Sequence, residues 1–201
     1  MLPLALSHAG AYCAAGTSFD DYLGLLGALP VTELFDDHPE ASYAQTVAST
    51  WQVSIQAAER EAPLAHQVLA MAAYLAPDAI PRELFEVLLD DASSAAALKQ
   101  LLDAFNALHR LSLIEVDEAG VNVHRLLQKT IRDDPVVRAD DAGASALAAV
   151  AAAFPRKLRE PHVWPQCERL LPHVLAIAAA LTTPGEAGPR LVTLLKNAAK
   201  Y

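Results

Sequence analysis

The sequence has few of the residues that build a disulfide scaffold, a membrane span or an aromatic surface. Aromatic residues make up 6% of the 201 residues, and there are two cysteines, Cys13 and Cys167. They lie far apart among helix formers, which favours free thiols in a reducing compartment over a disulfide. No apolar run reaches the roughly 20 residues of a membrane span. The apolar N-terminal stretch has no basic residues before it, so we interpret it as an amphipathic helix and not a signal peptide. We therefore expect a cytoplasmic protein with no membrane partner.

Positive charge is also scarce. The chain has 15 Lys and Arg residues against 24 Asp and Glu residues, a net charge of −9. An acidic surface repels the phosphate backbone, so we predict no nucleic-acid partner.

Sequence motifs of catalysis are missing as well. The sequence contains no P-loop of the form GxxxxGK[ST], and no GxSxG, HExxH or CxxC. Its seven histidines are scattered without metal-ligand spacing. Five pairs of adjacent acids fall in predicted loops or at predicted helix ends, where they suit capping and solvation better than acid–base chemistry. The sequence therefore predicts no catalytic residues and no metal site.

Alanine and leucine dominate the 53% of hydrophobic residues, which favours helices over sheets. The apolar spacing and the turn residues predict helices over residues 2–15, 22–28, 43–60, 64–75, 82–89, 96–111, 140–154, 165–181 and 190–201. Pro172 lies inside the eighth of these and is expected to bend or split it. The last helix has an apolar face without an evident partner, so we interpret it as a truncated element.

One segment, residues 111–132, has a different pattern. Leu111 to Val116 predicts a strand, residues 117–120 a turn, and Val121 to Val123 a second strand. Helical spacing resumes at Leu126, so His124 lies where the hairpin passes into a helix. Backbone N–H groups at a helix start favour an anion, and His124 could add an outward donor there. The alternative is a half-buried histidine that fixes the corner. A single hairpin after several helices predicts a mainly α fold with a winged-helix domain.

Several segments, in this order, resemble STAND-type NTPases of the NB-ARC group that carry tetratricopeptide repeats. LPLALSHAGAY (residues 2–12) resembles the segment after the nucleotide-binding core. TVASTWQVSIQAAERE with LAMAAYLAPDAIPRELF, and then LHRLSLIEVDEAGVNVHRLLQKTIRDD, resemble the beginning and end of the winged helix. AFPRKLREPHVWPQCERLLPHVLAIA resembles the helical link to the repeats, and LVTLLKNAAKY the entry to the first repeat.

The resemblance implies a domain division and a site. It places the end of the NTPase helical (ARC) subdomain in residues 1–39, the winged helix in 40–138, a helical linker in 139–184 and the first repeat helix in 185–201. Pro3 matches the proline that packs near the adenine of ADP, and His124 the histidine that reaches its β-phosphate. Met1 stands where glycine is usual, and Val123-His124-Arg125 replaces Met-His-Asp.

The function implied is regulatory and non-catalytic. ADP would hold a closed state and ATP an open one, bound mainly by a P-loop domain that this sequence lacks. The implied partners are that domain, the tetratricopeptide repeats, proteins bound by the repeats, and further copies in an active homo-oligomer. Two alternatives stay open: a winged-helix DNA-binding regulator that uses Lys99, His109 and Arg110, and a plain helical protein-interaction module.

Overall fold

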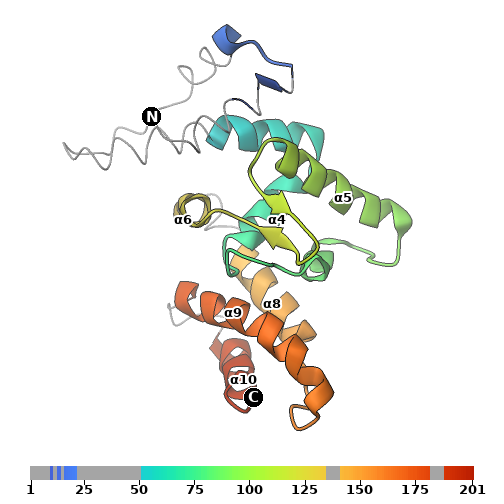
Figure 1. The fold of residues 1–201 in the computed structure, drawn as a ribbon, viewed down its shortest axis with the longest axis vertical. Helices are drawn as coiled ribbons and strands as arrows, with labels where there is room; N and C mark the ends of the chain where they lie inside the picture. The colour runs from blue at the N-terminus through green and yellow to red at the C-terminus, as the bar shows by residue number, and fades with distance from the viewer. Residues whose placement is uncertain (1–9, 11–12, 15, 22–50, 135–140, 182–187) are drawn as a thin grey trace, which may run out of the picture.

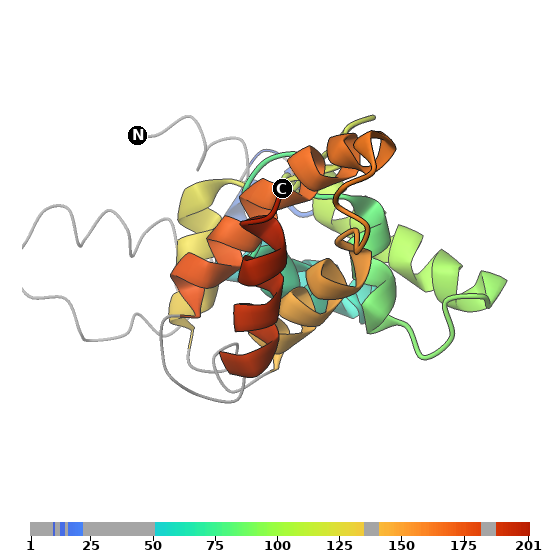
Figure 2. The ribbon, with the colours of Figure 1, turned by 90° about the horizontal axis from the view of Figure 1, so that it is seen from below.

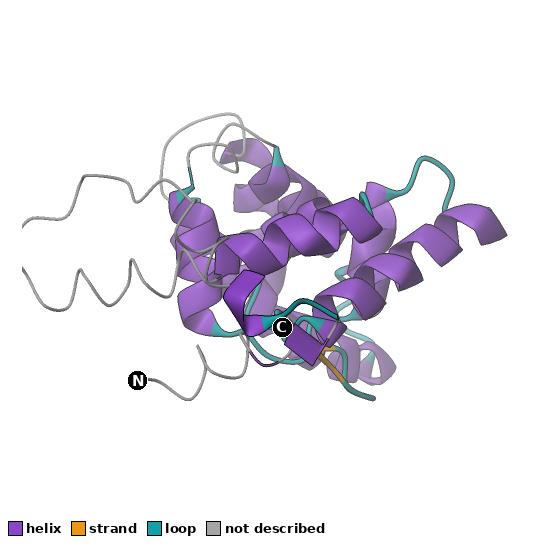
Figure 3. Cartoon of the chain, turned by 90° about the horizontal axis from the view of Figure 1, so that it is seen from above, coloured by secondary structure: helices purple, strands orange, loops and turns teal. Residues whose placement is uncertain are grey.

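A computed structural model describes residues 10, 13–14, 16–21, 51–134, 141–181 and 188–201. This part of the chain is mainly helical with one small hairpin, which confirms the predicted fold class (Figures 1 and 3). The helical elements are a helix over 51–61, α4 (Ala65–Ala72), the 3-10 helix η1 (Arg82–Leu88), α5 (Ala95–Arg110), α6 (Arg125–Asp133), α8 (Ala142–Ala153), the 3-10 helix η2 (Pro161–Val163), α9 (Trp164–Ala180) and α10 (Gly188–Ala198). The strands are β1 (Glu115–Val116) and β2 (Val121–Asn122). Pro3 and nearly all of the helices predicted over 2–15 and 22–28 lie outside the described residues.

The hairpin has a third, one-residue partner. β1 and β2 pair antiparallel, with Glu115 opposite Asn122 and Val116 opposite Val121. On its other side, Val121 forms a bridge with Ile80, which lies between α4 and η1. Along the chain, the order is therefore α4, the bridging residue Ile80, η1, α5 and the hairpin.

The first predicted strand is wrong over residues 111–114, because α5 ends there in a capping motif. Ser112 has a φ of 55°, in the left-handed region. The Leu113 N–H donates to the Leu108 carbonyl at 2.9 Å, and the Ser112 N–H donates to the His109 carbonyl at 2.9 Å. These are the two hydrogen bonds of a Schellman cap, and the buried Leu108 and Leu113 supply its usual apolar contact. Serine takes the place where glycine would have marked the helix end.

The segment predicted as a helix over 82–89 is a 3-10 helix, η1. Pro81, which precedes η1, and Leu89, which follows it, both have an extended backbone. A segment this short forms few α-helical hydrogen bonds, and its tighter turns place Leu84 and Phe85 in the core. The Phe85 ring meets the Phe105 ring edge-on, with centroids 5.4 Å apart.

Pro172 does not split its helix, which was one of the two predicted outcomes, and a bend there stays a prediction. α9 runs without interruption from Trp164 to Ala180. Pro172 is exposed, as is Glu168 one turn earlier. The carbonyl that loses its hydrogen bond to a proline nitrogen therefore faces solvent, where water can satisfy it.

The apolar face of the last helix also has a partner, contrary to the prediction. α10 packs against both α8 and α9, and Figure 2 shows it lying beside α9. Leu194 is 3% exposed, and Leu191, Leu195 and Ala198 pack around it against the core. α8 in turn packs on α4 and η1, so one hydrophobic core runs from the helix over 51–61 to α10. No helix within the described ranges is both long and apolar enough to cross a bilayer.

Candidate functional site

His124 is the N-cap of α6, the helix that follows the hairpin. Its backbone is extended, with φ −62° and ψ 132°, which turns the chain from β2 into the helix. The Leu126 N–H donates to Nδ1 of His124 at 3.2 Å. One of the free amides at the helix start is thereby satisfied by a side chain. The predicted position of His124 at the start of the helix is confirmed. Its exposure contradicts the half-burial of the alternative interpretation, although the cap does fix the corner between hairpin and helix.

The cap determines which nitrogen faces outward. Because Nδ1 accepts from a backbone N–H, the neutral ring carries its proton on Nε2. Nε2–H is therefore the donor available to a ligand. Arg125, also exposed, follows at the first position of α6. A helix start with a donor and a guanidinium can meet a phosphate oxygen.

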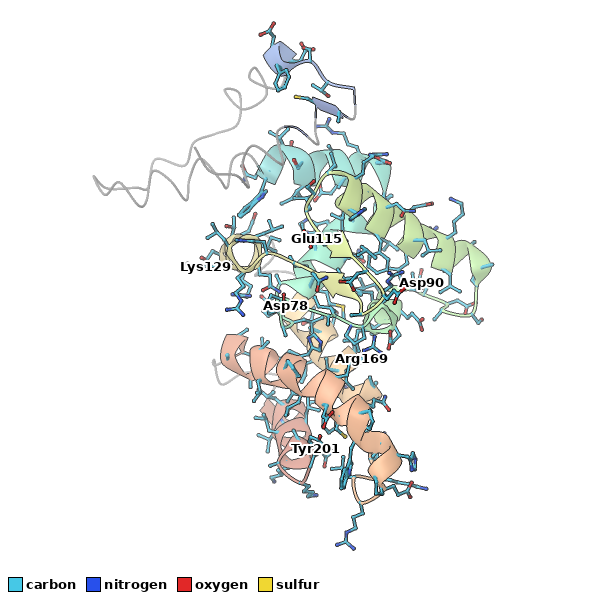
Figure 4. The ribbon with its side chains drawn as sticks, viewed as in Figure 1. Asp78, Asp90, Glu115, Lys129, Arg169 and Tyr201 are labelled. Atoms are coloured by element: carbon cyan, nitrogen blue, oxygen red, sulfur yellow. The ribbon has the colours of Figure 1, made fainter. Side chains whose placement is uncertain are left out.

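The surroundings of His124 include acids. A hollow of about 210 Å³ beside it is lined by Asp78 and Glu115 as well as by His124 and Asn122. Figure 4 labels Asp78 and Glu115 on the hairpin side of the molecule. Two carboxylates close to a histidine repel an anion, so this chain alone gives a weak phosphate site. Positive groups from elsewhere would have to balance them.

Trp51 connects the site to the helix over 51–61. Its ring is 1% exposed, and its centroid lies 6.5 Å from that of His124 at an interplanar angle of 48°. The buried tryptophan thus lies beside the exposed imidazole. The sequence predicted a helix over 43–60, but gave no sign of this contact.

Sequence reasoning missed a second group of polar residues, which hold the turn after α4. Gln128 of α6 is 3% exposed, and its Nε2 donates to the carbonyls of Ala72 at 2.8 Å and Leu75 at 3.0 Å. Arg132, one turn later, donates to the Ala73 carbonyl. These carbonyls lie at the end of α4 and in the turn after it, where few backbone N–H groups are available to them. A polar residue inside the apolar stripe of α6 was the signal available in the sequence.

α9 reaches the same turn through His173. This residue is 1% exposed, and its Nδ1 accepts from the Ala76 N–H at 3.1 Å. Burial, more than the nearby charge of Arg169, lowers the pKa of His173 to about 4, although a hydrogen bond to the Ala79 backbone opposes the shift. His173 is therefore neutral at pH 7 and serves as a buried acceptor. We call residues 73–79 the junction turn, because α6 and α9 both bind it.

The hairpin completes the set of contacts on the junction turn. The Ala79 N–H donates to Oδ1 of Asn122 at 2.7 Å, and the Val123 N–H donates to the Pro77 carbonyl at 2.7 Å. Val123 immediately precedes His124. The junction turn thus lies one residue from the candidate site and contacts α6, α9 and β2.

A second link joins α9 to the tip of the hairpin. Arg169, labelled in Figure 4, forms an ion pair with Glu83 of η1 at 2.8 Å, and its other nitrogen donates to the Ala119 carbonyl at 3.4 Å. Both side chains are about half exposed, so the pair adds little stability. Arg169 thereby connects α9 to η1 and to the tip of the hairpin.

Two further predictions concern metal binding and the two cysteines. No group of three or more metal-binding side chains occurs among the residues that the structure describes. Cys13 and Cys167 are free, as predicted, and burial raises the pKa of the Cys167 thiol. Pro3 lies outside the residues that the structure describes, so its predicted place in the site stays a prediction. Comparison with protein-family models, with curated proteins and with solved structures found no match for this chain.

Proposed function

We propose that this chain is the regulatory, non-catalytic part of a STAND-type signalling ATPase of the NB-ARC group. In this proposal His124 donates through Nε2 to a phosphate of ADP that a separate P-loop domain of the same protein holds. ADP favours the closed state, ATP the open one, and a tetratricopeptide-repeat sensor biases the choice. The equilibrium between the closed and open states can shift only if the protein contacts ADP and ATP differently.

The observation that supports this proposal is the geometry of His124. The residue is exposed, caps α6 through Nδ1, and leaves Nε2–H free for a ligand. The acids Asp78 and Glu115 beside it explain why the phosphate would depend on a second domain for most of its positive charge. The junction turn gives such a contact a route to α9, since Val123 and His173 bind the same turn.

The cations of α5 weigh against the DNA-binding alternative. Lys99 is paired with Asp103 at 2.6 Å, and Arg110 is paired with Glu61. Nδ1 of His109 lies 3.2 Å from the Ile114 carbonyl. Each side chain that could approach a phosphate backbone therefore already has a partner, and α5 also exposes Leu98 and Leu102. Affinity for DNA depends on cations that are free to neutralise phosphates.

The test separates the cap from the donor by two substitutions of His124. His124→Ala removes both, whereas His124→Asn keeps an N-cap acceptor and removes the imidazole. In the isolated chain, His124→Ala should lower the free energy of unfolding by about 1 kcal/mol, and His124→Asn by only a few tenths. Urea denaturation followed by circular dichroism measures both values.

In the full-length parent, both variants should retain less ADP than the unsubstituted protein after purification. Retained nucleotide is measured by denaturing the protein and separating ADP and ATP by chromatography. If His124→Asn keeps ADP fully while His124→Ala loses it, the histidine acts only as a cap. Unchanged ADP in both variants would rule out the switch role.

A further inference from the structure

Charge is divided unevenly along the chain. Residues 155–201 contain seven Lys and Arg residues against three Asp and Glu residues, although the whole chain has a net charge of −9. The rest of the molecule is correspondingly more acidic. Such asymmetry indicates that the basic part meets an anion.

Several of these cations surround one hollow. It has a volume of about 810 Å³ and lies between the loop after α8 and the end of α10. Its lining consists of Arg156, Lys157, Leu158, Arg159, Glu160, Asn197 and Lys200. Small-molecule sites commonly have volumes of about 300–1,000 Å³, so the hollow suits a ligand and not merely a single ion.

The loop that carries the arginines is fixed in place. Nε1 of Trp164 donates to the Leu158 carbonyl at 3.0 Å, and the Glu160 N–H donates to the Lys157 carbonyl at 3.1 Å. The Trp164 ring meets the Tyr201 ring edge-on, and the Tyr201 hydroxyl donates to Glu168 of α9 at 2.9 Å (Figure 4). These contacts hold the loop against the end of the chain, so the hollow exists before a ligand arrives.

The one acid of the hollow is already paired. Glu160 lies 3.6 Å from Nζ of Lys157 and 3.5 Å from Nε2 of His162. In the described part of the chain, Arg156, Arg159 and Lys200 have no ion-pair partner. Three exposed cations around one concave surface therefore keep their charge available, which is unusual in a protein of this acidity.

We propose that this hollow binds the phosphate chain of a small polyphosphate-bearing molecule, such as a nucleoside triphosphate or inorganic tripolyphosphate. Two of its three available cations are arginines, whose planar forks match phosphate oxygens bidentately. Lys200, in the turn after α10, adds a point charge to the same lining. The site lies apart from His124 and does not depend on the function proposed above.

The test is calorimetric titration of the 201-residue chain with tripolyphosphate, with ATP and with hexaglutamate, at low and at physiological salt. Tripolyphosphate should bind, and the Arg156→Ala/Arg159→Ala variant should bind it at least about tenfold more weakly, since two charge-assisted contacts are lost. Equal affinity for ATP and tripolyphosphate assigns the site to the phosphate chain alone. Tighter binding of ATP assigns it to a nucleotide.

The matched control is Arg190→Ala/Lys196→Ala. It removes two exposed cations from the same basic segment and none from the lining of the hollow. Its affinity for tripolyphosphate should stay within about twofold of the unsubstituted chain, because screening weakens distant surface charges. If both variants lose affinity for tripolyphosphate equally, the ligand is attracted by the overall positive charge of the segment, and the proposed site is wrong. Absence of tripolyphosphate binding, or equal binding of hexaglutamate, would also overturn it.

Discussion

Replacing Gly120 with alanine is expected to lower the free energy of unfolding by about 3 kcal/mol or more. Gly120 has a φ of 152°, which side-chain-bearing residues rarely adopt. A Cβ built there lies 2.2 Å from the carbonyl oxygen and 2.8 Å from the carbonyl carbon of Ile80. The obstruction is backbone, so no side-chain rotation can relieve it.

The clash lies at the bridge between Val121 and Ile80, which joins the hairpin to the segment between α4 and η1. The Val121 N–H donates to the Ile80 carbonyl, and the Ile80 N–H donates to the Val121 carbonyl, both at 2.9 Å. Any shift that makes room for the methyl group breaks this pair. It also disturbs the turn, since the Gly120 N–H donates to Oδ1 of Asp117 at 3.0 Å.

Thermal denaturation followed by circular dichroism should show the Gly120→Ala midpoint lowered by on the order of 10 °C. Gly188→Ala is the matched control, since a Cβ there meets nothing within 4 Å. It should leave the midpoint within a few degrees of the unsubstituted chain or slightly above it. Gly143→Ala tests the physical argument, because its methyl group meets side-chain atoms of Leu181 and Tyr74 and not backbone. A loss in Gly120→Ala no larger than that in Gly143→Ala would contradict the backbone clash.

Sequence patterns predicted the long helices well. Helices predicted over 96–111 and 165–181 were found as α5 (Ala95–Arg110) and α9 (Trp164–Ala180). Apolar spacing is informative over several turns because one face must meet the core throughout. The mainly α fold with one hairpin followed from these lengths and from a single segment with strand and turn residues.

The predictions that differ from the structure concern features that local residue spacing does not determine. Pro172 is tolerated because it lies on the exposed side of α9, which spacing alone did not establish. The apolar face of α10 meets α9, the helix before it, and α8, although the spacing within residues 190–201 does not show which elements cover that face. Ser112 ends α5 without the glycine that would have marked a Schellman cap.

The candidate site was only partly predictable. The sequence placed His124 at the start of a helix, since strand spacing gives way to helical spacing there. It gave no sign of the junction turn, because His173 and Ala76 are separated by 97 positions and meet only in the folded chain. The same holds for Gln128, which contacts Ala72 and Leu75 more than 50 positions earlier.

Lowering the pH from 6.5 to 4.5 is expected to destabilise the chain through His173. Burial lowers the pKa of this residue to about 4 in the folded state, against 6.5 in the unfolded chain. Between these values the unfolded chain binds a proton that the folded chain does not, so the free energy of unfolding falls as pH falls. The full difference corresponds to about 3 kcal/mol, and most of it is lost by pH 4.5. Above pH 6.5 this contribution is fully present and constant.

Equilibrium urea denaturation at several pH values between 7 and 4.5 measures this slope in the unsubstituted chain, in His173→Gln and in His162→Gln. Glutamine keeps a hydrogen-bond acceptor but does not titrate, so His173→Gln should flatten the slope even if it costs some stability at pH 7. His162 is 75% exposed at its side chain, and its replacement should leave the slope unchanged. Hydrogen bonds hold the pKa of Asp117 and of Asp91 below 3.8, so stability from these carboxyls is lost mainly under pH 4. If the free energy of unfolding of His173→Gln still falls as the pH is lowered, the proton uptake belongs to another group. If this pH dependence disappears, the junction turn is the acid-sensitive contact between α9 and the hairpin.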